Sequence, residues 1–193
     1  MLAVRKEGQA MIVQAKKEQL DQICRFYQDV TDDLERRTNY PLWTWGIHPD
    51  YTGLKDAVEN NELFLFIPDD FEEILRQKDL FEWSYPFAGA AVVNSSWEDG
   101  GEIQWIGDNF SAIHLFAIHP ALGKLGLADR FLDEIMKSAS KQEIDSIRLD
   151  LIEGNWPAGH LYLRHGFESR GKGQFKPEGE KVLNFEYREF IFK

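Results

Sequence analysis

The chain has 193 residues, of which 43% are hydrophobic and 28% charged, the composition of a folded globular protein. Asp and Glu number 33 against 22 Lys and Arg, so the net charge of −11 lacks the basic footprint that a nucleic-acid partner needs. No apolar run reaches the roughly 18 residues of a membrane span, and the single cysteine, Cys24, excludes an internal disulfide.

Apolar periodicity predicts the elements of the first half. Residues 9–15 are predicted to form a strand, and residues 17–30 a helix, because apolar side chains in 17–30 recur every three or four positions. Residues 40–52 are aromatic and hold two prolines, which predicts a structured loop. A short helix around 54–58 and a strand at 62–67 follow.

An inserted segment is expected at 70–83. Asp70 with Glu73 three residues later resembles a capping box, so we expect a short helix over 70–79. A strand at 87–94 follows, where small residues allow close packing.

Strands and helices alternate in the second half, which favours a layered α/β or α+β sheet. The predicted elements are a strand at 111–118, a long helix from Lys124, a strand at 144–152, a helix at 157–165, and closing strands at 167–170 and 182–192. Nothing divides the chain, so we expect one domain over 1–193. The charged start, Met1–Glu7, lacks the apolar core of a signal peptide, so we expect a cytoplasmic protein.

The turn after His119-Pro120 is the first candidate binding segment. Its sequence is Gly123-Lys124-Leu125-Gly126-Leu127-Ala128. Glycines let the backbone approach a ligand, and the free amides at a helix start bind phosphate oxygens. The segment matches neither a Walker A loop nor a dinucleotide fingerprint, and a plain strand-to-helix turn is the alternative.

Asn155 and Tyr162 define a second candidate segment. Asn155 stands where the cap of the next helix belongs, and Tyr162 follows seven residues later. The alternatives to a functional role are a helix cap for Asn155 and core packing for Tyr162.

Together the two segments resemble the GNAT superfamily of acyl-CoA-dependent N-acetyltransferases. The first is similar to a family motif in which a strand is followed by x-Pro and then by the pattern Gln/Arg-x-x-Gly-x-Gly/Ala. The second is similar to a family motif that consists of Asn, a small residue three positions later, Tyr seven positions later and then Gly-Phe. The matching residues of the second segment are Asn155, Ala158, Tyr162, Gly166 and Phe167. One departure is that Gly123 replaces the usual Gln or Arg, and Lys124 the next residue, often Gly.

The resemblance implies a mixed, mostly antiparallel sheet of about seven strands flanked by helices. Two neighbouring strands would splay to admit acetyl-CoA as co-substrate. The residues it implies for acetyl-CoA binding are Phe116, Ala117, Ile118, Gly123, Lys124, Leu125, Gly126, Leu127, Ala128 and Asn155.

The resemblance also implies transfer of acetyl to a primary amine by direct attack in a ternary complex. Tyr162 would be the general acid that protonates the departing sulfur. Asp150, His114 or an ordered water would be the base, and His114 has a pKa naturally near the working range. No histidine or cysteine spacing indicates a metal.

The acceptor is expected at the loop of residues 40–52, where Trp43 and Trp45 are the candidate contacts, with Tyr40, His48 and Trp105 beside them. Core packing of these aromatics is an equal alternative. The acceptor would be a small molecule or a peptide, with no nucleic acid or membrane involved. Dimers are common in the family, so a homodimer stays open.

Two other functions compete with this prediction. A non-catalytic acyl-CoA sensor on the same fold is one, and it is favoured only by Gly123 in place of Gln or Arg. An unrelated α/β nucleotide binder is the other, and it would leave the match over 155–167 a coincidence.

Overall fold

Both halves of the chain contribute strands to a single sheet, which the computed structural model describes over residues 10–97, 103–176 and 182–193. The seven strands lie in the order β1-β2-β3-β4-β5-β7-β6. They are β1 (Met11–Gln14), β2 (Leu63–Ile67), β3 (Gly89–Asn94), β4 (Phe110–Ile118), β5 (Ser146–Ile152), β6 (Glu168–Phe175) and β7 (Leu183–Ile191). Only β4 and β5 are parallel, so the expected mixed, mostly antiparallel sheet is confirmed.

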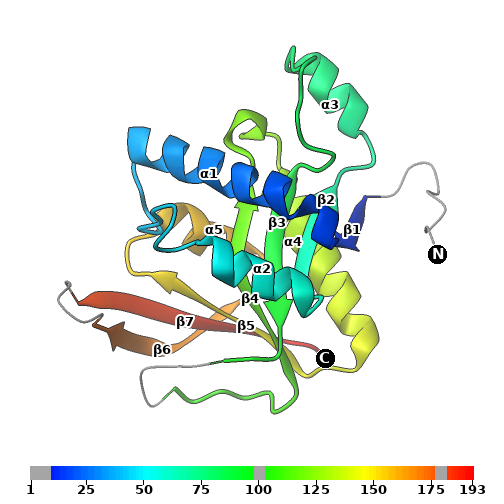
Figure 1. Cartoon of the computed structure of the whole chain (residues 1–193). Coiled ribbons are helices and arrows are strands. Elements are labelled where there is room, and N and C mark those ends of the chain that lie inside the picture. Colours follow the sequence, from blue (N-terminus) through cyan, green and yellow to red (C-terminus); the bar gives the residue numbers. More distant parts are fainter. Residues whose placement is uncertain (1–9, 98–102, 177–181) are drawn as a thin grey trace.

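Helices cover both faces of this sheet (Figure 1). The helices are α1 (Leu20–Arg36), α2 (Tyr51–Glu59), α3 (Phe71–Gln77), α4 (Leu127–Ala139) and α5 (Trp156–Arg164). Figure 1 shows α1 and α2 in front of the sheet, α4 and α5 behind it, and α3 projecting at one end. Within the described residues, no helix combines the length and apolar character needed to cross a bilayer.

Each face has its own apolar core. In front, α1 and α2 bury Ile23, Phe26 and Leu54 against the alternate strand residues that point forward. Behind, α4 and α5 bury Phe131 and Leu161 against the residues that point the other way. The apolar side chains of the helices, which repeat every 3.6 residues, pack on strand side chains that alternate between the two faces. A shift of one residue in a strand would turn its apolar side chains to the wrong face, so this packing fixes the strand register.

Two local predictions are wrong. The long helix does not begin at Lys124 but at Leu127, because Lys124 and Gly126 both adopt the left-handed conformation with φ of 67°. The Asp70–Glu73 capping box also does not form, and Asp70 makes no side-chain cap. Its carboxylate instead pairs with Arg130 of α4, which also binds Asp69. This pairing ties the α3 segment to the first turn of α4.

A buried ion network joins the three C-terminal strands to the segment before β4. Glu189 of β7 is fully buried and accepts hydrogen bonds from the backbone amides of Ile106 (3.0 Å) and Gly107 (3.2 Å). It also pairs with Arg170 of β6 (2.9 Å) and Arg148 of β5 (3.4 Å). Burial raises the pKa of Glu189, but these hydrogen bonds outweigh it and bring the pKa below the usual value.

We predict that Glu189→Ala lowers the free energy of unfolding by about 3–5 kcal/mol, because it leaves the buried Arg148 without its carboxylate. Chemical denaturation followed by circular dichroism measures the change. Glu168→Gln is the matched control, since it removes an exposed carboxylate from Arg170 and is expected to cost less than about 1 kcal/mol. Equal losses in the two variants would show that the network is not a stabilising centre.

Candidate active site

The centre of the sheet contains a gap between β4 and β5. These strands pair only over three positions, Phe110 with Ser146, Ser111 with Ile147 and Ala112 with Arg148. Beyond Ala112 and Arg148 no further pairs form between these two described strands, although both continue for several residues. The strands therefore separate toward their carboxyl ends and leave backbone groups free between them.

The backbone of β4 presents hydrogen-bonding groups to this gap. His119 N donates to Ala88 O (2.9 Å), and Ala117 lies opposite Ala90. Because successive residues of a strand face opposite sides, the N–H and C=O groups of Ile118 and Phe116 point away from β3. Ala117 differs from its two neighbours, since its backbone faces β3 and its side chain is buried in the front core.

A β-bulge interrupts β4 where the gap begins. His114 lies opposite Val92 and Ala117 opposite Ala90, so Leu115 and Phe116 together face the single residue Ala91. Leu115 has a φ of 50°, which strains a residue other than glycine. The buried Tyr27 of α1 donates its hydroxyl to Leu115 O at 2.7 Å. This hydrogen bond holds the bulge in place from the front face.

Tyr162 of α5 lies behind the same part of β4. Its side chain is buried, and its ring centroid is 6.4 Å from that of Phe116. None of the hydrogen bonds among the described residues uses its hydroxyl. Burial raises the pKa of Tyr162, Asp150 raises it further, and Arg188 opposes the rise, so the phenol stays protonated and able to donate.

The turn between β4 and α4 has the properties of an anion site. Gly126 precedes α4 without a side-chain cap, so within the described residues no capping side chain bonds the amides of the first turn of α4. A Cβ added at Gly126 would meet nothing within 4 Å, which leaves the approach to those amides open. Lys124 is exposed and takes part in no hydrogen bond or ion pair among the described residues. These groups fit a phosphate-bearing ligand.

His119 fixes the start of this turn. Its Nδ1 accepts from Ala121 N at 3.2 Å, so in the neutral imidazole the proton lies on Nε2. That nitrogen lies 3.3 Å from Asp29 Oδ2, which also accepts from the hydroxyl of Tyr85. Burial lowers the pKa of His119 and Asp29 opposes this shift. The ring therefore links α1 to the turn as a neutral donor and acceptor.

Asn155 forms the cap that its position suggests. Its Oδ1 accepts from Ala158 N at 3.4 Å, at the start of α5. Its Nδ2 makes no hydrogen bond among the described residues and is free to donate to a ligand. The cap and a binding role therefore use different atoms of one side chain.

A cavity of about 690 Å³ opens on the front face beside the gap, and we call it the histidine cavity. His114 and Asp150 lie two residues beyond Ala112 and Arg148, the last pair of β4 and β5, so they stand level on the two separating strands. His48, from the loop before α2, lies at the same cavity. The other lining residues include Asp50, Asp56, Glu62, Asn94, Ser96, Trp97, Leu115, Phe175, Phe185 and Tyr187.

The charges of His114 and Asp150 depend on each other. Burial lowers the pKa of His114, although Asp150, Glu62 and a hydrogen bond to the Ser96 backbone all raise it. Burial raises the pKa of Asp150, and the nearby His114 and His48 lower it. A neutral imidazole beside a carboxyl group can take up a proton near neutral pH.

Of the predicted aromatic contacts, His48 lines this cavity, whereas the three tryptophans lie outside its lining. Trp43 packs behind His48 (6.2 Å between ring centroids) and against Tyr27, and Trp45 packs partly buried against the front core. Trp105 stacks on Arg148 and lies 5.2 Å from Trp97. Trp97 and Tyr187, which the sequence did not single out, line the cavity instead.

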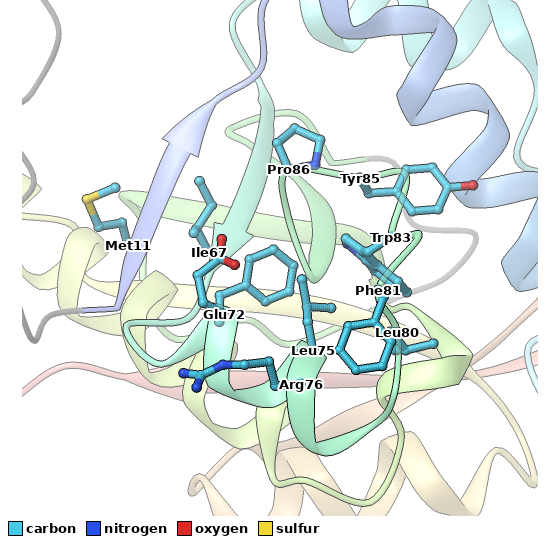
Figure 2. A pocket seen from close by; sticks show the side chains of 11 residues that line it. Met11, Ile67, Glu72, Leu75, Arg76, Leu80, Phe81, Trp83, Tyr85 and Pro86 are labelled. Atoms are coloured by element: carbon cyan, nitrogen blue, oxygen red, sulfur yellow. The ribbon is translucent and has the colours of Figure 1, made fainter.

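A second cavity, of about 620 Å³, lies between α3 and the first strands, and we call it the α3 cavity (Figure 2). Figure 2 shows Leu75, Leu80 and Phe81 gathered near Trp83. Among its described lining residues only Glu72 and Arg76 are charged, and it contains no histidine. Of these two cavities, the histidine cavity is the one that brings histidines and carboxyl groups together.

Comparison with known proteins agrees with this geometry. The model of the acetyltransferase (GNAT) family matches residues 24–167. No curated protein sequence matches the chain.

Solved structures share the fold at low sequence identity. An acetyltransferase of the GNAT family from Listeria monocytogenes is 19% identical with a TM-score of 0.65, and the match covers 95% of each chain. NAA60 of Arabidopsis thaliana, in complex with a bisubstrate analogue, is 15% identical with a TM-score of 0.62, over 95% of this chain and 98% of that one. A ribosomal-protein-alanine N-acetyltransferase from Brucella melitensis is 14% identical with a TM-score of 0.63, over 94% and 99%.

We predict that Tyr27→Phe lowers the free energy of unfolding by about 1–3 kcal/mol, because the partly buried Leu115 carbonyl loses its hydrogen bond. Chemical denaturation measures the effect. Tyr40→Phe is the control, since Tyr40 is exposed and its change is expected to stay within about 0.5 kcal/mol. A Tyr27→Phe protein as stable as its parent would show that the hydroxyl does not hold the bulge.

Proposed function

Because this chain belongs to the GNAT family of acetyltransferases, we propose that it moves acetyl from acetyl-CoA to a primary amine held in the histidine cavity. The observation that carries the proposal is the position of His114 and Asp150, level with each other where β4 and β5 begin to separate. The acid–base pair thus stands beside the free backbone groups of β4. The bisubstrate analogue bound to NAA60 supports a site that holds both substrates together.

The cofactor side of the proposed site uses backbone groups first. The first-turn amides of α4 and Lys124 bind the phosphates, and Phe116 and Ile118 pair with the pantetheine arm along the gap. The Nδ2 of Asn155 donates to the same arm. When bound, acetyl-CoA supplies the acetyl group as a reactive thioester.

Two proton transfers accompany the reaction. A C–N bond forms to the amine and the C–S bond to CoA breaks, while the amine loses one proton and the sulfur gains one. His114, assisted by Asp150, takes the proton from the amine on the front face. Tyr162, on the rear face, donates to the sulfur. A free amide of β4 beside the bulge stabilises the charge that develops on the carbonyl oxygen.

The alternative function is a non-catalytic acyl-CoA sensor, which is suggested by the glycine at position 123. Gly123 lacks the side chain that usually opens the phosphate loop, but Lys124 is free to supply a positive charge beside it. A sensor also has no use for an acid–base pair beside the gap. The enzyme is therefore the better supported interpretation of the two.

A thiol-release assay tests the proposal. Acetyl-CoA is incubated with alkyl amines, an arylalkyl amine and a peptide with a free N-terminus, and the CoA thiol is titrated. We expect release above background with at least one amine. Tight CoA binding without release from any amine would favour the sensor, and absence of CoA binding would contradict the proposal as a whole.

We predict that Tyr162→Phe lowers kcat by about 10²–10⁴-fold, the range attributed to a positioned general acid. The Kd for CoA, measured by calorimetry, should change little because the phenyl ring keeps its contacts with Phe116 and Phe167. Phe167→Leu offers a control that alters the same packing without touching a hydroxyl. An unchanged kcat in Tyr162→Phe would remove Tyr162 as the acid.

We predict that kcat/KM falls as the pH drops below about 6.5, the usual pKa of histidine, because His114 must be neutral to take a proton. Burial lowers the pKa of His114, so the loss should set in on the acid side of that value. In His114→Gln the activity should be low and this acid limb should disappear. A limb of the same shape in His114→Gln would assign the titration to another group, such as the exposed His48.

A further inference from the structure

The walls of the histidine cavity carry carboxylates without matching cations. Asp50, Asp56, Glu62 and Asp150 line it, and its described lining includes no lysine or arginine. Within the described chain none of the four forms an ion pair with a lysine or arginine. Lys55 of α2 and Lys17 instead pair with Glu59, which is not part of the lining, at 3.6 and 3.2 Å. The cavity thus presents carboxyl groups without a lysine or arginine partner to whatever enters it.

Three of these carboxylates define two ends of the cavity, and the fourth, Asp50, caps the start of α2. Asp150 lies on β5 beside His114, whereas Glu62 directly precedes β2 and Asp56 lies on α2. In the sheet order β2 is three positions from β5, and β4 and β5 have already separated at Asp150, so at about 4.8 Å per paired position the two strands lie at least roughly 14 Å apart. Val93 N bonds to Glu62 O, and Val92 lies opposite His114, so both ends stand at a similar height along the strands. One small ammonium group cannot contact both ends at once.

Val92 of β3 and Leu115 of β4 line the cavity on the two strands between β2 and β5, and aromatic rings extend the apolar lining past Asp150 to β7. Trp97 stacks on His114 with ring centroids 5.7 Å apart, and Phe185 stacks on Tyr187 at 6.4 Å. Such faces bind methylene chains by apolar contact and ammonium groups by cation–π attraction. The volume of about 690 Å³ holds far more than a single amine and its first carbon, since one water molecule takes about 30 Å³.

We propose that the acceptor is an alkyl diamine or polyamine, a cation with at least two amine groups joined by methylenes. One amine meets His114 and Asp150 and is acetylated there. The second stays protonated against Asp56 and Glu62, and the methylenes lie between the two amines on the apolar lining of β3 and β4. This inference rests on the proposed acetyl transfer and names the acceptor of that same site.

The test compares acceptors that differ in one charge. Steady-state kinetics give kcat/KM for hexane-diamine, with an amine at each end of the chain, and for n-hexylamine, 2-phenylethylamine and a peptide with a free N-terminus. We expect the diamine to exceed n-hexylamine by at least tenfold at low salt. The advantage should shrink at 0.5 M salt, because exposed charges are screened.

The double variant Asp56→Asn/Glu62→Gln locates the second amine. Its KM for hexane-diamine should rise at least tenfold more than its KM for n-hexylamine, and calorimetry should show a matching loss of diamine affinity. Glu18→Gln is the control, because Glu18 is an exposed carboxylate outside the cavity lining, and it should leave the ratio between the two acceptors as in the parent.

The outcomes separate this inference from the proposed function. Equal kcat/KM for the diamine and n-hexylamine, or a double variant that weakens both alike, overturns the diamine proposal while acetyl transfer stands. Turnover of the phenylethylamine or the peptide but not of the diamine has the same meaning. Thiol release with none of the four acceptors contradicts both proposals.

Discussion

The arrangement of this protein depends on the separation of two parallel strands that begin as neighbours. β4 and β5 share three paired positions and then part, which leaves strand backbone without a partner in the middle of the sheet. Such groups are costly when buried and unbonded, so the gap suits an elongated polar ligand that can pair with them. The bulge at Leu115, bonded to Tyr27 in front, and Phe116, packed near Tyr162 behind, lie where the separation develops.

The two faces of the sheet divide the chemistry. The front face carries His114, Asp150 and His48 under α1 and α2, where an acceptor would enter. The rear face carries Tyr162 on α5, within a buried apolar core. A proton would thus be removed on one side of the sheet and supplied on the other. This separation keeps the neutral phenol in an apolar environment, away from the His114 and Asp150 pair.

The sequence predicted the elements well because apolar periodicity is a local property. It failed where a distant residue decided the outcome. Asp70 has a capping sequence, but Arg130, sixty residues later, takes its carboxylate. The network around Glu189 joins three strands and a loop, so no local pattern indicates it. The positions of the phosphate turn and of Tyr162 were predicted from family spacing, and their roles stay predictions. Trp97 and Tyr187 could not be assigned to the cavity, because only the folded sheet brings them beside His114.

The turn between β4 and α4 departs from the family's pattern at Gly123 and Lys124, and the backbone conformation of Lys124 gives this departure a physical meaning. The family often places glycine at this position, and the observed φ of 67° explains why, since glycine alone adopts it without strain. A lysine there costs about 1–2 kcal/mol in backbone energy. The preceding residue, Gly123, lacks the Gln or Arg side chain that is usual in the family. The missing side chain at position 123 is thus followed directly by a strained, positively charged side chain at position 124. The two departures together place a side-chain charge one residue later than the Gln or Arg of the family's pattern, at a position that often has no side chain.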